Sequence, residues 1–293
     1  MPRNDRLYEK ASQSGFMKPE LTLAYSPCPN DTFLFYHLIH EDISEKFSVK
    51  EELHDVEKLN EYSKKARFDV TKLSFFAYFH VIEGYSLLNS GSALGRGCGP
   101  LLVKKKGKDL KKVKGEKILV PGLKTTANLL LTVYLQKDFL PTPLRYDLIM
   151  DKILSEEFDL GVIIHEERFT YEERGLEKVI DLGDYWESLT GKPIPLGAIA
   201  VKRSTDIDLQ KEFDKSLRKS LDLAYQFPEK TRNYILQNSQ VKDENVVKSH
   251  IDLYVNEFTK DIGDEGKDAV YALLEKAKSL GLVKESKVGM FVE

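Results

Sequence analysis

The segment IIHEERFTY, residues 163–171, joins a histidine and two carboxylates to the end of an apolar run. The run is typical of a buried strand, so we expect His165 near the end of that strand, facing a cleft. Histidine titrates near neutral pH and therefore suits general-base chemistry. Glu166 or Glu167 is then placed to orient the ring. The alternative is a histidine that only forms hydrogen bonds within the wall of the protein.

A second cluster of polar residues lies in SPCPNDT, residues 26–32. Ser26, Asn30 and Asp31 follow the apolar run 21–25 and precede an apolar segment that we expect to be a helix. Ligands of open α/β sheets bind at this edge, where hydroxyl, amide and backbone N–H groups are available. The alternative role for these residues is a tight turn that caps the helix.

Two more segments place polar groups at strand and helix ends. TKLS ends an expected strand, so Lys72 either faces the cleft or extends to solvent. In PGLKTTANLLL, Thr125 and Thr126 stand at the start of an apolar helix. The free N–H groups and the dipole of such a helix favour an anion such as a carboxylate, and two hydroxyls add donors. Simple capping is the alternative.

Several other chemistries are excluded by the motifs. GRGCGP, residues 95–100, precedes a strand-like segment rather than the helix that a dinucleotide-binding loop needs. We interpret it as close backbone packing or a hinge. The chain has no Gly-x-Ser-x-Gly elbow, His-Glu-x-x-His pair or Walker loop, and Cys28 and Cys98 lack zinc-site spacing. Proton abstraction by one histidine is therefore favoured over hydrolysis or redox chemistry.

The order of elements predicts an α/β fold. A strand–loop–helix pattern recurs at residues 21–40, 49–66, 69–82 and 118–136, and further strands are expected at 159–166 and 196–202. The last third is helical, with apolar stripes at Leu209, Phe213, Leu217 and Leu221 and at Val270, Leu273, Ala277 and Leu280, the latter ended by Gly281. It has too few strands for its own sheet, so we expect it to pack back onto the first unit.

These elements predict two lobes with a cleft between them, where small ligands bind. We assign residues 19–104 plus 203–293 to a larger lobe, 105–202 to a smaller lobe, and 1–18 to a polar extension. GRGCGP and IPLGAIAV are expected to form the two crossings. The lysine-rich segment 104–117 is interpreted as a solvated loop between the lobes.

Composition narrows the class of protein further. The 293 residues carry 44 basic and 47 acidic side chains, a net charge of −3, so no electrostatic footprint for nucleic acid or an anionic membrane is present. Hydrophobic residues make up 41%, which is ample for a core. No apolar run reaches the ~18 residues of a membrane span, and the N-terminus lacks a secretory signal. We therefore predict a soluble, cytoplasmic protein.

Seven motifs, in matching order from about residue 20 to the C-terminus, resemble the 1,4-dihydroxy-6-naphthoate synthases of the futalosine route to menaquinone. They are SPCPNDTFLFYHLIH, DVTKLS, ALGRGCGPLLV, VPGLKTTANLLL, GVIIHEERFTY, IPLGAIAVKR and LYVNEFTKDIG. The resemblance implies a two-lobed fold like that of type 2 periplasmic binding proteins, with a helix-flanked mixed sheet in each lobe. It implies no metal and no organic cofactor.

The resemblance also implies a carbon–carbon lyase that converts cyclic dehypoxanthine futalosine, which bears an aromatic carboxylate, to 1,4-dihydroxy-6-naphthoate. It makes His165 the general base. It places substrate contacts at Lys72, Leu73, Ser74, Thr125 and Thr126, and it adds Ser26, Asn30 and Asp31 as cleft residues. Two rival interpretations stay open, a solute-binding protein without catalysis and the sibling chorismate dehydratase. The sequence also leaves a homodimer open.

Overall fold

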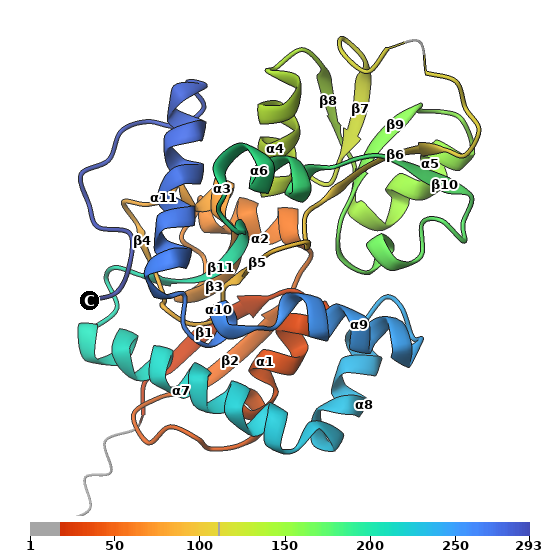
Figure 1. Ribbon diagram of the computed structural model, residues 1–293. Helices are drawn as coiled ribbons and strands as arrows, with labels where there is room; N and C mark the ends of the chain where they lie inside the picture. Colours follow the sequence, from red (N-terminus) through yellow and green to blue (C-terminus); the bar gives the residue numbers. More distant parts are fainter. Residues whose placement is uncertain (1–17, 111) are drawn as a thin grey trace, which may run out of the picture.

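The computed structural model describes residues 18–110 and 112–293, so the predicted extension 1–18 lies outside the described residues except for Lys18. The described chain forms two lobes, each built on one mixed β-sheet flanked by helices (Figure 1). Residues of both lobes line a cavity between them. The predicted two-lobed α/β fold is therefore confirmed.

The sheet of the larger lobe has the strand order β2-β1-β3-β11-β4, and β5 pairs with β11 beside this path. Strands β1, β2 and β3 run parallel, whereas β11 runs antiparallel to its neighbours. The strands are β1 Glu20–Tyr25, β2 Ser48–Leu53, β3 Val70–Ser74, β4 Tyr85–Leu87, β5 Ala93–Gly95 and β11 Ile194–Lys202. The helices are α1 Pro29–His40, α2 Val56–Ser63, α3 Phe75–Tyr78, α7 Ile207–Gln226, α8 Pro228–Asn238, α9 Glu244–Tyr254, α10 Glu257–Lys260 and α11 Gly263–Ser279.

The sheet of the smaller lobe has the strand order β10-β6-β9-β7-β8. Strand β7 runs parallel to β8 and β9, and β6 runs antiparallel to β9 and β10. The strands are β6 Leu101–Lys105, β7 Lys117–Val120, β8 Leu140–Pro143, β9 Leu160–Ile163 and β10 Leu176–Asp181. The helices are α4 Thr126–Leu135, α5 Ile149–Leu154 and α6 Leu182–Thr190, with 3-10 helices η1 Tyr146–Leu148 and η2 His165–Phe169.

Local sequence explains where several helices begin and end. The Asp55 side chain accepts hydrogen bonds from two backbone N–H groups in the first turn of α2, as predicted. Helix α1 starts at Pro29, before the predicted start at residue 33, because proline suits the first turn of a helix. After α11, Gly281 adopts a left-handed φ of 64°, a conformation that ends helices and favours glycine.

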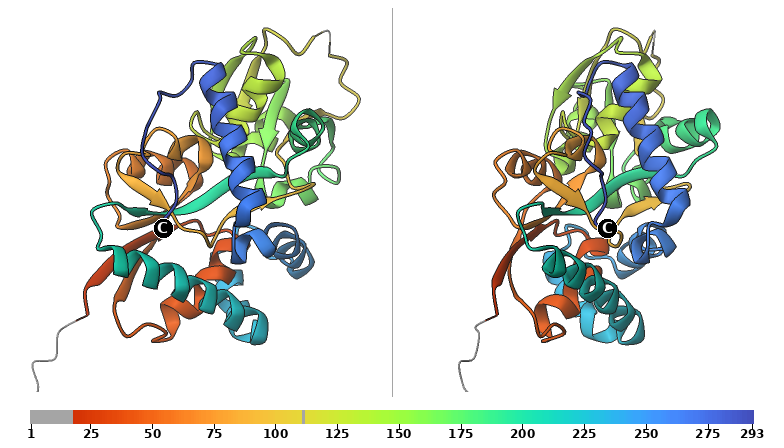
Figure 2. Two further views of the ribbon diagram at one scale, coloured as in Figure 1. Left: turned by 60° about the vertical axis from the view of Figure 1, so that its left-hand side comes forward. Right: turned by 90° about the vertical axis from the view of Figure 1, so that its left-hand side faces the viewer.

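The helical last third packs back onto the larger lobe, as predicted. Helix α7 lies against α1, and Phe213, Leu217 and Leu221 are buried in the same core as Phe35 and Leu38 (Figures 1 and 2). Helix α11 lies against β11 and α3. The strands of the larger lobe are therefore covered by helices that are distant in sequence.

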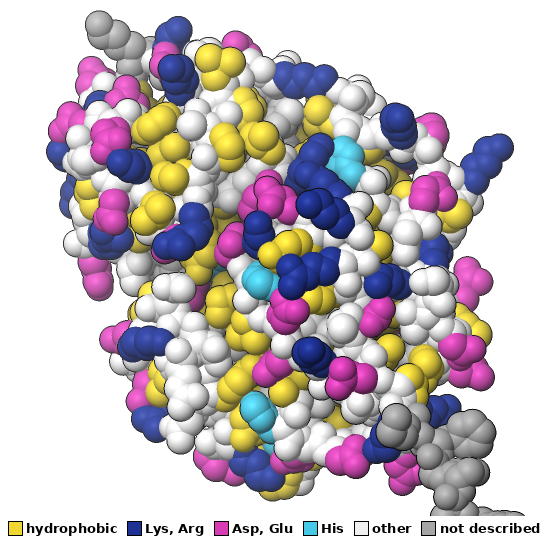
Figure 3. Space-filling view, turned by 180° about the vertical axis from the view of Figure 1, so that it is seen from behind, with side chains coloured by type: hydrophobic (Ala, Val, Ile, Leu, Met, Phe, Trp, Pro, Cys, Tyr) yellow, Lys and Arg dark blue, Asp and Glu magenta, His cyan; other side chains and the backbone are white. Residues whose placement is uncertain are grey.

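The surface of the described residues carries basic and acidic side chains side by side. On the face in Figure 3, Lys and Arg side chains lie among Asp and Glu side chains. Exposed ion pairs of the described residues include Lys248–Asp252 and Lys260–Asp222. Among the described residues, no helix has the length and apolar character that a membrane crossing requires.

Two predicted connections differ from the structure. The strand expected over 159–166 ends at Ile163, because His165 has a φ of 58°, which is outside the extended region. The lysine-rich segment 104–117 joins β6 to β7, which belong to the same sheet. It is therefore a loop within the smaller lobe and not a connection between lobes.

The chain passes between the sheets at two places. The first is the predicted crossing GRGCGP, between β5 and β6. The second was expected at IPLGAIAV, but that segment lies in β11, where it forms backbone ladders with β3 and β5. The return instead runs between β10 and β11, through α6. The predicted boundary at 104/105 falls within β6, and the one at 202/203 falls at the end of β11.

The two crossings touch through glycines. A Cβ on Gly99 would collide with the backbone of Gly183, and one on Gly183 would collide with the backbone of Gly99. Arg168 secures the contact, because its guanidinium donates hydrogen bonds to the Gly99 carbonyl and, at 2.8 Å, to Asp181. The predicted close backbone packing of GRGCGP is therefore confirmed.

We expect Gly99→Ala to lower the free energy of unfolding by about 1–3 kcal/mol, because the added methyl group meets backbone that cannot rotate away. Urea denaturation measures this change. Gly84→Ala is the matched control, since a Cβ there makes only an ordinary contact at 3.6 Å. Equal midpoints for Gly99→Ala and the wild type would contradict the close approach.

Candidate active site

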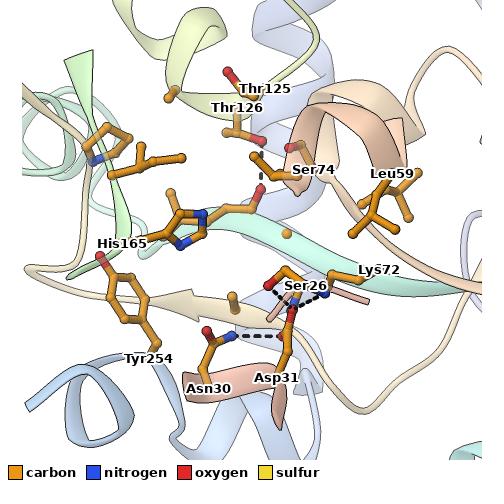
Figure 4. Close-up of a pocket in the computed structure, with 18 of the residues that line it drawn as sticks. Ser26, Asn30, Asp31, Leu59, Lys72, Ser74, Thr125, Thr126, His165 and Tyr254 are labelled. Carbon is orange, nitrogen blue, oxygen red and sulfur yellow. Dashed lines mark hydrogen bonds and ion pairs between the residues drawn. The ribbon is translucent and has the colours of Figure 1, made fainter. Parts of the chain in front are cut away.

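All of the predicted site residues line one cavity between the two sheets (Figure 4). The cavity has a volume of about 90 Å³, which leaves room for several water molecules. Figure 4 shows the imidazole of His165 projecting into this space between Thr126 and Asp31. The predicted residues around it are Ser26, Asn30, Asp31, Lys72, Leu73, Ser74, Thr125 and Thr126.

The Asp31 carboxylate is the centre of the polar network on the larger-lobe side. It is 1% exposed and receives hydrogen bonds from Lys72 Nζ at 2.8 Å, Ser26 Oγ at 2.8 Å and Asn30 Nδ2 at 2.9 Å. Buried charges are stable only when they are paired and hydrogen-bonded in this way. Lys72 is 8% exposed, so its ammonium does not extend to solvent.

Asn30 extends this network to His250, on α9. The Oδ1 atom of Asn30 lies 2.8 Å from His250 Nε2, while its amide group donates to Asp31. The Asn30 oxygen must then accept, so Nε2 of His250 carries the proton. The ring of His250 stacks on that of His165, with centroids 6.1 Å apart and an interplanar angle of 27°. Burial holds the pKa of His250 well below its usual range, and that ring stays neutral.

His165 occupies a strained backbone position at the beginning of η2. Its φ of 58° is rare for a residue with a side chain, and such strain persists where the surrounding structure enforces it. The ring packs edge-on against Tyr146, with centroids 5.0 Å apart. Burial lowers its pKa to about 4, although the nearby Asp31 carboxylate opposes this shift. At neutral pH the imidazole is therefore neutral and can accept a proton.

The acidic residues after His165 do not orient it. Both carboxylate oxygens of Glu166 are buried and have no hydrogen-bond partner among the described residues. Burial raises the pKa of Glu166, and burial together with Glu166 raises the pKa of Glu167 to about 9. The expected orienting role is therefore not found, and the ring is held by packing against Tyr146 and His250.

The two threonine hydroxyls already have partners. Thr125 Oγ1 donates to the Gly122 carbonyl at 2.8 Å and accepts from Asn128 N, which makes Thr125 the cap of α4. Thr126 Oγ1 donates to the carbonyl of Leu196, in β11, at 2.8 Å. Both hydroxyl groups therefore donate to backbone carbonyls and are not the extra donors that were expected for a ligand. The N–H groups of the first turn, at Thr126 and Ala127, are what this helix offers an anion.

Ser74 and Leu73 complete the larger-lobe wall. Asn60 clamps Ser74, because its Oδ1 accepts from Ser74 N at 2.9 Å and its Nδ2 donates to Ser74 Oγ at 3.2 Å. The Ser74 hydroxyl accepts this bond and keeps its own proton for a ligand. The apolar side chains of Leu73 and Leu59 lie beside it and favour a flat, apolar part of a ligand.

Sequence reasoning missed two aromatic residues of this site. Tyr254 lines the cavity, and His250, one helical turn earlier, packs against it with centroids 4.6 Å apart. Tyr254 lies in the motif LYVNEFTKDIG, which was a usable signal. His250 carries no local signal, because its partner Asn30 is 220 positions away in the chain.

The fold and this cleft define a class of proteins with the periplasmic-binding-protein architecture. The alkanesulfonate-binding protein SsuA of Xanthomonas axonopodis pv. citri, described as bound to MOPS, superimposes with a TM-score of 0.71 at 14% identity. The match covers 92% of this chain and 96% of that one. The protein AF1704 of Archaeoglobus fulgidus gives a TM-score of 0.85 at 33% identity, covering 90% and 98%.

The chain belongs to a menaquinone biosynthesis family, whose sequence model matches residues 21–279. It is 42% identical over 272 residues to a 1,4-dihydroxy-6-naphtoate synthase of Thermus thermophilus, covering 93% of this chain and 99% of that protein. It is 38% identical over 270 residues to the Streptomyces coelicolor protein of the same name, covering 90% and 94%. The predicted family and the prediction of an enzyme are confirmed.

We expect Lys72→Met to lower the free energy of unfolding by about 3–5 kcal/mol, because it leaves the buried Asp31 carboxylate without its cation. Urea denaturation is the measurement. Lys248→Met is the control, since Lys248 pairs with Asp252 where both side chains are exposed, and such pairs contribute ~0–1 kcal/mol. Equal losses in the two variants would show that the Asp31 carboxylate does not depend on Lys72.

Proposed function

We propose that this protein converts cyclic dehypoxanthine futalosine to 1,4-dihydroxy-6-naphthoate, with His165 as the general base. The observation that carries the proposal is the position of the His165 imidazole, which projects into the cavity opposite the N-terminus of α4. The names of the two relatives support the product. A reaction without a cofactor fits a site whose reactive group is one side chain.

The cavity offers a distinct place for each part of such a substrate. The aromatic carboxylate binds the N–H groups of Thr126 and Ala127, because a helix N-terminus favours negative charge. The apolar wall at Leu59 and Leu73 receives the ring system. The sugar-derived ring then lies toward His165, Ser26 and the Asp31–Lys72 pair, where hydroxyl groups find polar partners.

The chemistry follows from this placement. His165 removes a proton from a carbon of the sugar-derived ring, and the electron pair left behind drives elimination and carbon–carbon cleavage. The proton on His165 is available to the departing fragment. Formation of the aromatic product makes the sequence favourable overall. The negative charge of a bound carboxylate raises the basicity of the buried imidazole when the substrate is present.

The assay that tests the function supplies the purified protein with cyclic dehypoxanthine futalosine and follows the naphthoate by chromatography. Product formation with turnover is expected. A solute-binding protein would bind the compound without converting it. The sibling activity, chorismate dehydratase, is tested in parallel with chorismate, and turnover of chorismate alone would overturn the proposal. The HEERFTY segment and the Thr125–Thr126 pair favour the naphthoate synthase.

We also propose that the lobes open and close about the two crossings, with β1 to β5 and β11 in the larger lobe and β6 to β10 in the smaller lobe. The cavity of about 90 Å³ supports this, because ligand pockets usually enclose ~300–1,000 Å³. The Thr126–Leu196 hydrogen bond spans the lobes and would break on opening.

We also propose a cytoplasmic location. It is supported by two free cysteines, Cys28 and Cys98, because thiols stay reduced in that compartment.

X-ray scattering in solution tests the lobe motion. We expect the radius of gyration to fall when naphthoate product is added at saturating concentration, because the ligand bridges the lobes and favours the closed state. Identical scattering curves with and without ligand would argue against closure. Benzoate at the same concentration is the control for an effect of the carboxylate alone.

We expect His165→Ala to reduce kcat by about 10²–10⁴-fold, which is the usual contribution of a general base. Chromatographic turnover assays measure the loss, and circular dichroism checks that the variant is folded. His54→Ala is the matched control, because His54 pairs with Glu52 and does not line the cavity. Turnover like that of the wild type in His165→Ala would remove His165 from the mechanism.

The pH dependence gives an independent check on the base. His165 is active when neutral, and its pKa of about 4 in the free protein keeps it neutral above that pH. We therefore expect kcat/KM to stay level from pH 7 down to ~5 and to fall about tenfold per unit below pH ~4. A fall centred at the ordinary histidine value of ~6.5 would contradict the burial of the base.

A further inference from the structure

Three side chains of different chemistry meet beside the cavity. Cys28, His165 and Glu166 place one thiol, one imidazole and one carboxylate so that their potential ligand atoms all lie within 4.8 Å of one another. Cys28 is the N-cap of α1 in the larger lobe, whereas His165 and Glu166 open η2 in the smaller lobe. The cluster therefore spans the cleft, and the proposed reaction uses only one of its three members.

The Glu166 carboxylate of this cluster is buried. Glu166 is 2% exposed, and neither of its oxygens has a hydrogen-bond partner among the described residues. The Nε2 atom of His165 is likewise buried without a partner. Buried polar atoms without partners are uncommon in native proteins, and a bound ion is one recognised way in which they are satisfied. Cys28 is also 2% exposed, which keeps solvent from the thiol.

The three ligand types of this cluster favour zinc over hard cations. Thiolate sulfur, imidazole nitrogen and carboxylate oxygen are the three ligand types that zinc takes in proteins, and three protein ligands with an open fourth position are typical of non-structural zinc sites. Hard ions such as Mg²⁺ and Ca²⁺ prefer sites made of oxygen alone. A thiolate and a carboxylate together cancel the charge of a divalent ion, which lowers the cost of burying it.

We propose that Cys28, His165 and Glu166 form an inhibitory binding site for Zn²⁺. The ion bonds to Cys28 Sγ, to one nitrogen of His165 and to one oxygen of Glu166, with water or a substrate oxygen in the fourth position. The bound ion blocks the imidazole that would accept the substrate's proton. It also links the two lobes, because Cys28 belongs to the larger lobe and Glu166 to the smaller lobe. Asp31 stays outside the site, because its oxygens are held by Lys72, Ser26 and Asn30.

Cobalt(II) reports the site directly, because its absorption spectrum shows whether a thiolate is bonded to the metal. The full-length, tag-free protein is titrated with CoCl₂ and then with ZnCl₂ against a chromophoric chelator. We expect about one equivalent to bind, a thiolate-to-cobalt charge-transfer band, and displacement of cobalt by zinc. This measurement uses no substrate, so it does not depend on the proposed reaction.

Variants assign the ligands. Cys28→Ser should abolish the charge-transfer band. Cys28→Ser and Glu166→Gln should each weaken zinc binding by at least ~10–100-fold. Loss of a residue that only supports a metal ligand already costs that much, and these variants remove a ligand itself. Cys98→Ser is the matched control, since Cys98 is also buried and lines the same cavity but is not a member of the cluster. The control should keep the band and the affinity.

Inhibition is tested separately and rests on the proposed function. We expect equimolar Zn²⁺ to suppress naphthoate formation by the wild-type protein and a chelator to restore it. Glu166→Gln should need at least about tenfold more zinc for the same effect. Absence of a thiolate band in the wild type, or loss of the band in Cys98→Ser with retention in Cys28→Ser, would overturn the site. If Cys28→Ser does not fold, the charge-transfer band of the wild-type protein and the zinc affinity of Glu166→Gln still test the site.

Discussion

The buried contact between Lys72 and Asp31 connects the parts of the chain that form the cleft. Asp31 lies in the first turn of α1, Lys72 lies in the middle of β3, and Asn30 connects the network to His250 in α9. A carboxylate removed from water is stable only with this full set of donors. The relative position of α1, β3 and α9 is therefore fixed by electrostatics as well as by apolar packing, and the ring of His250 is held where it stacks on His165.

The low dielectric around this network determines which groups are charged. Burial lowers the pKa of His165 to about 4, raises the pKa of Glu166, and together with Glu166 raises the pKa of Glu167 to about 9, so it disfavours the charged form of each of these groups. A negatively charged ligand entering this region changes the balance, because its charge favours protonation of the imidazole. A bound anion near the ring would therefore raise the pKa of His165.

Much of the fold could be predicted from local patterns. The alternation of apolar runs with turn residues located β1, β3 and α4, and Asp55 marked the beginning of α2. The same reasoning placed His165 at a strand end. It did not find His250 or the proximity of Cys28 to Glu166, because these contacts join residues that are distant in sequence and have no periodic signal. It also expected free hydroxyls at Thr125 and Thr126, which the backbone uses.

The left-handed backbone at His165 has a consequence for how this protein tolerates change. An L-residue with a Cβ is disfavoured in that conformation by roughly 1–2 kcal/mol, whereas glycine adopts it freely. Glycine at this position would relieve the backbone strain, but it would also remove the imidazole from the cavity. Backbone stability and the proposed role of the imidazole therefore place opposite demands on this one position.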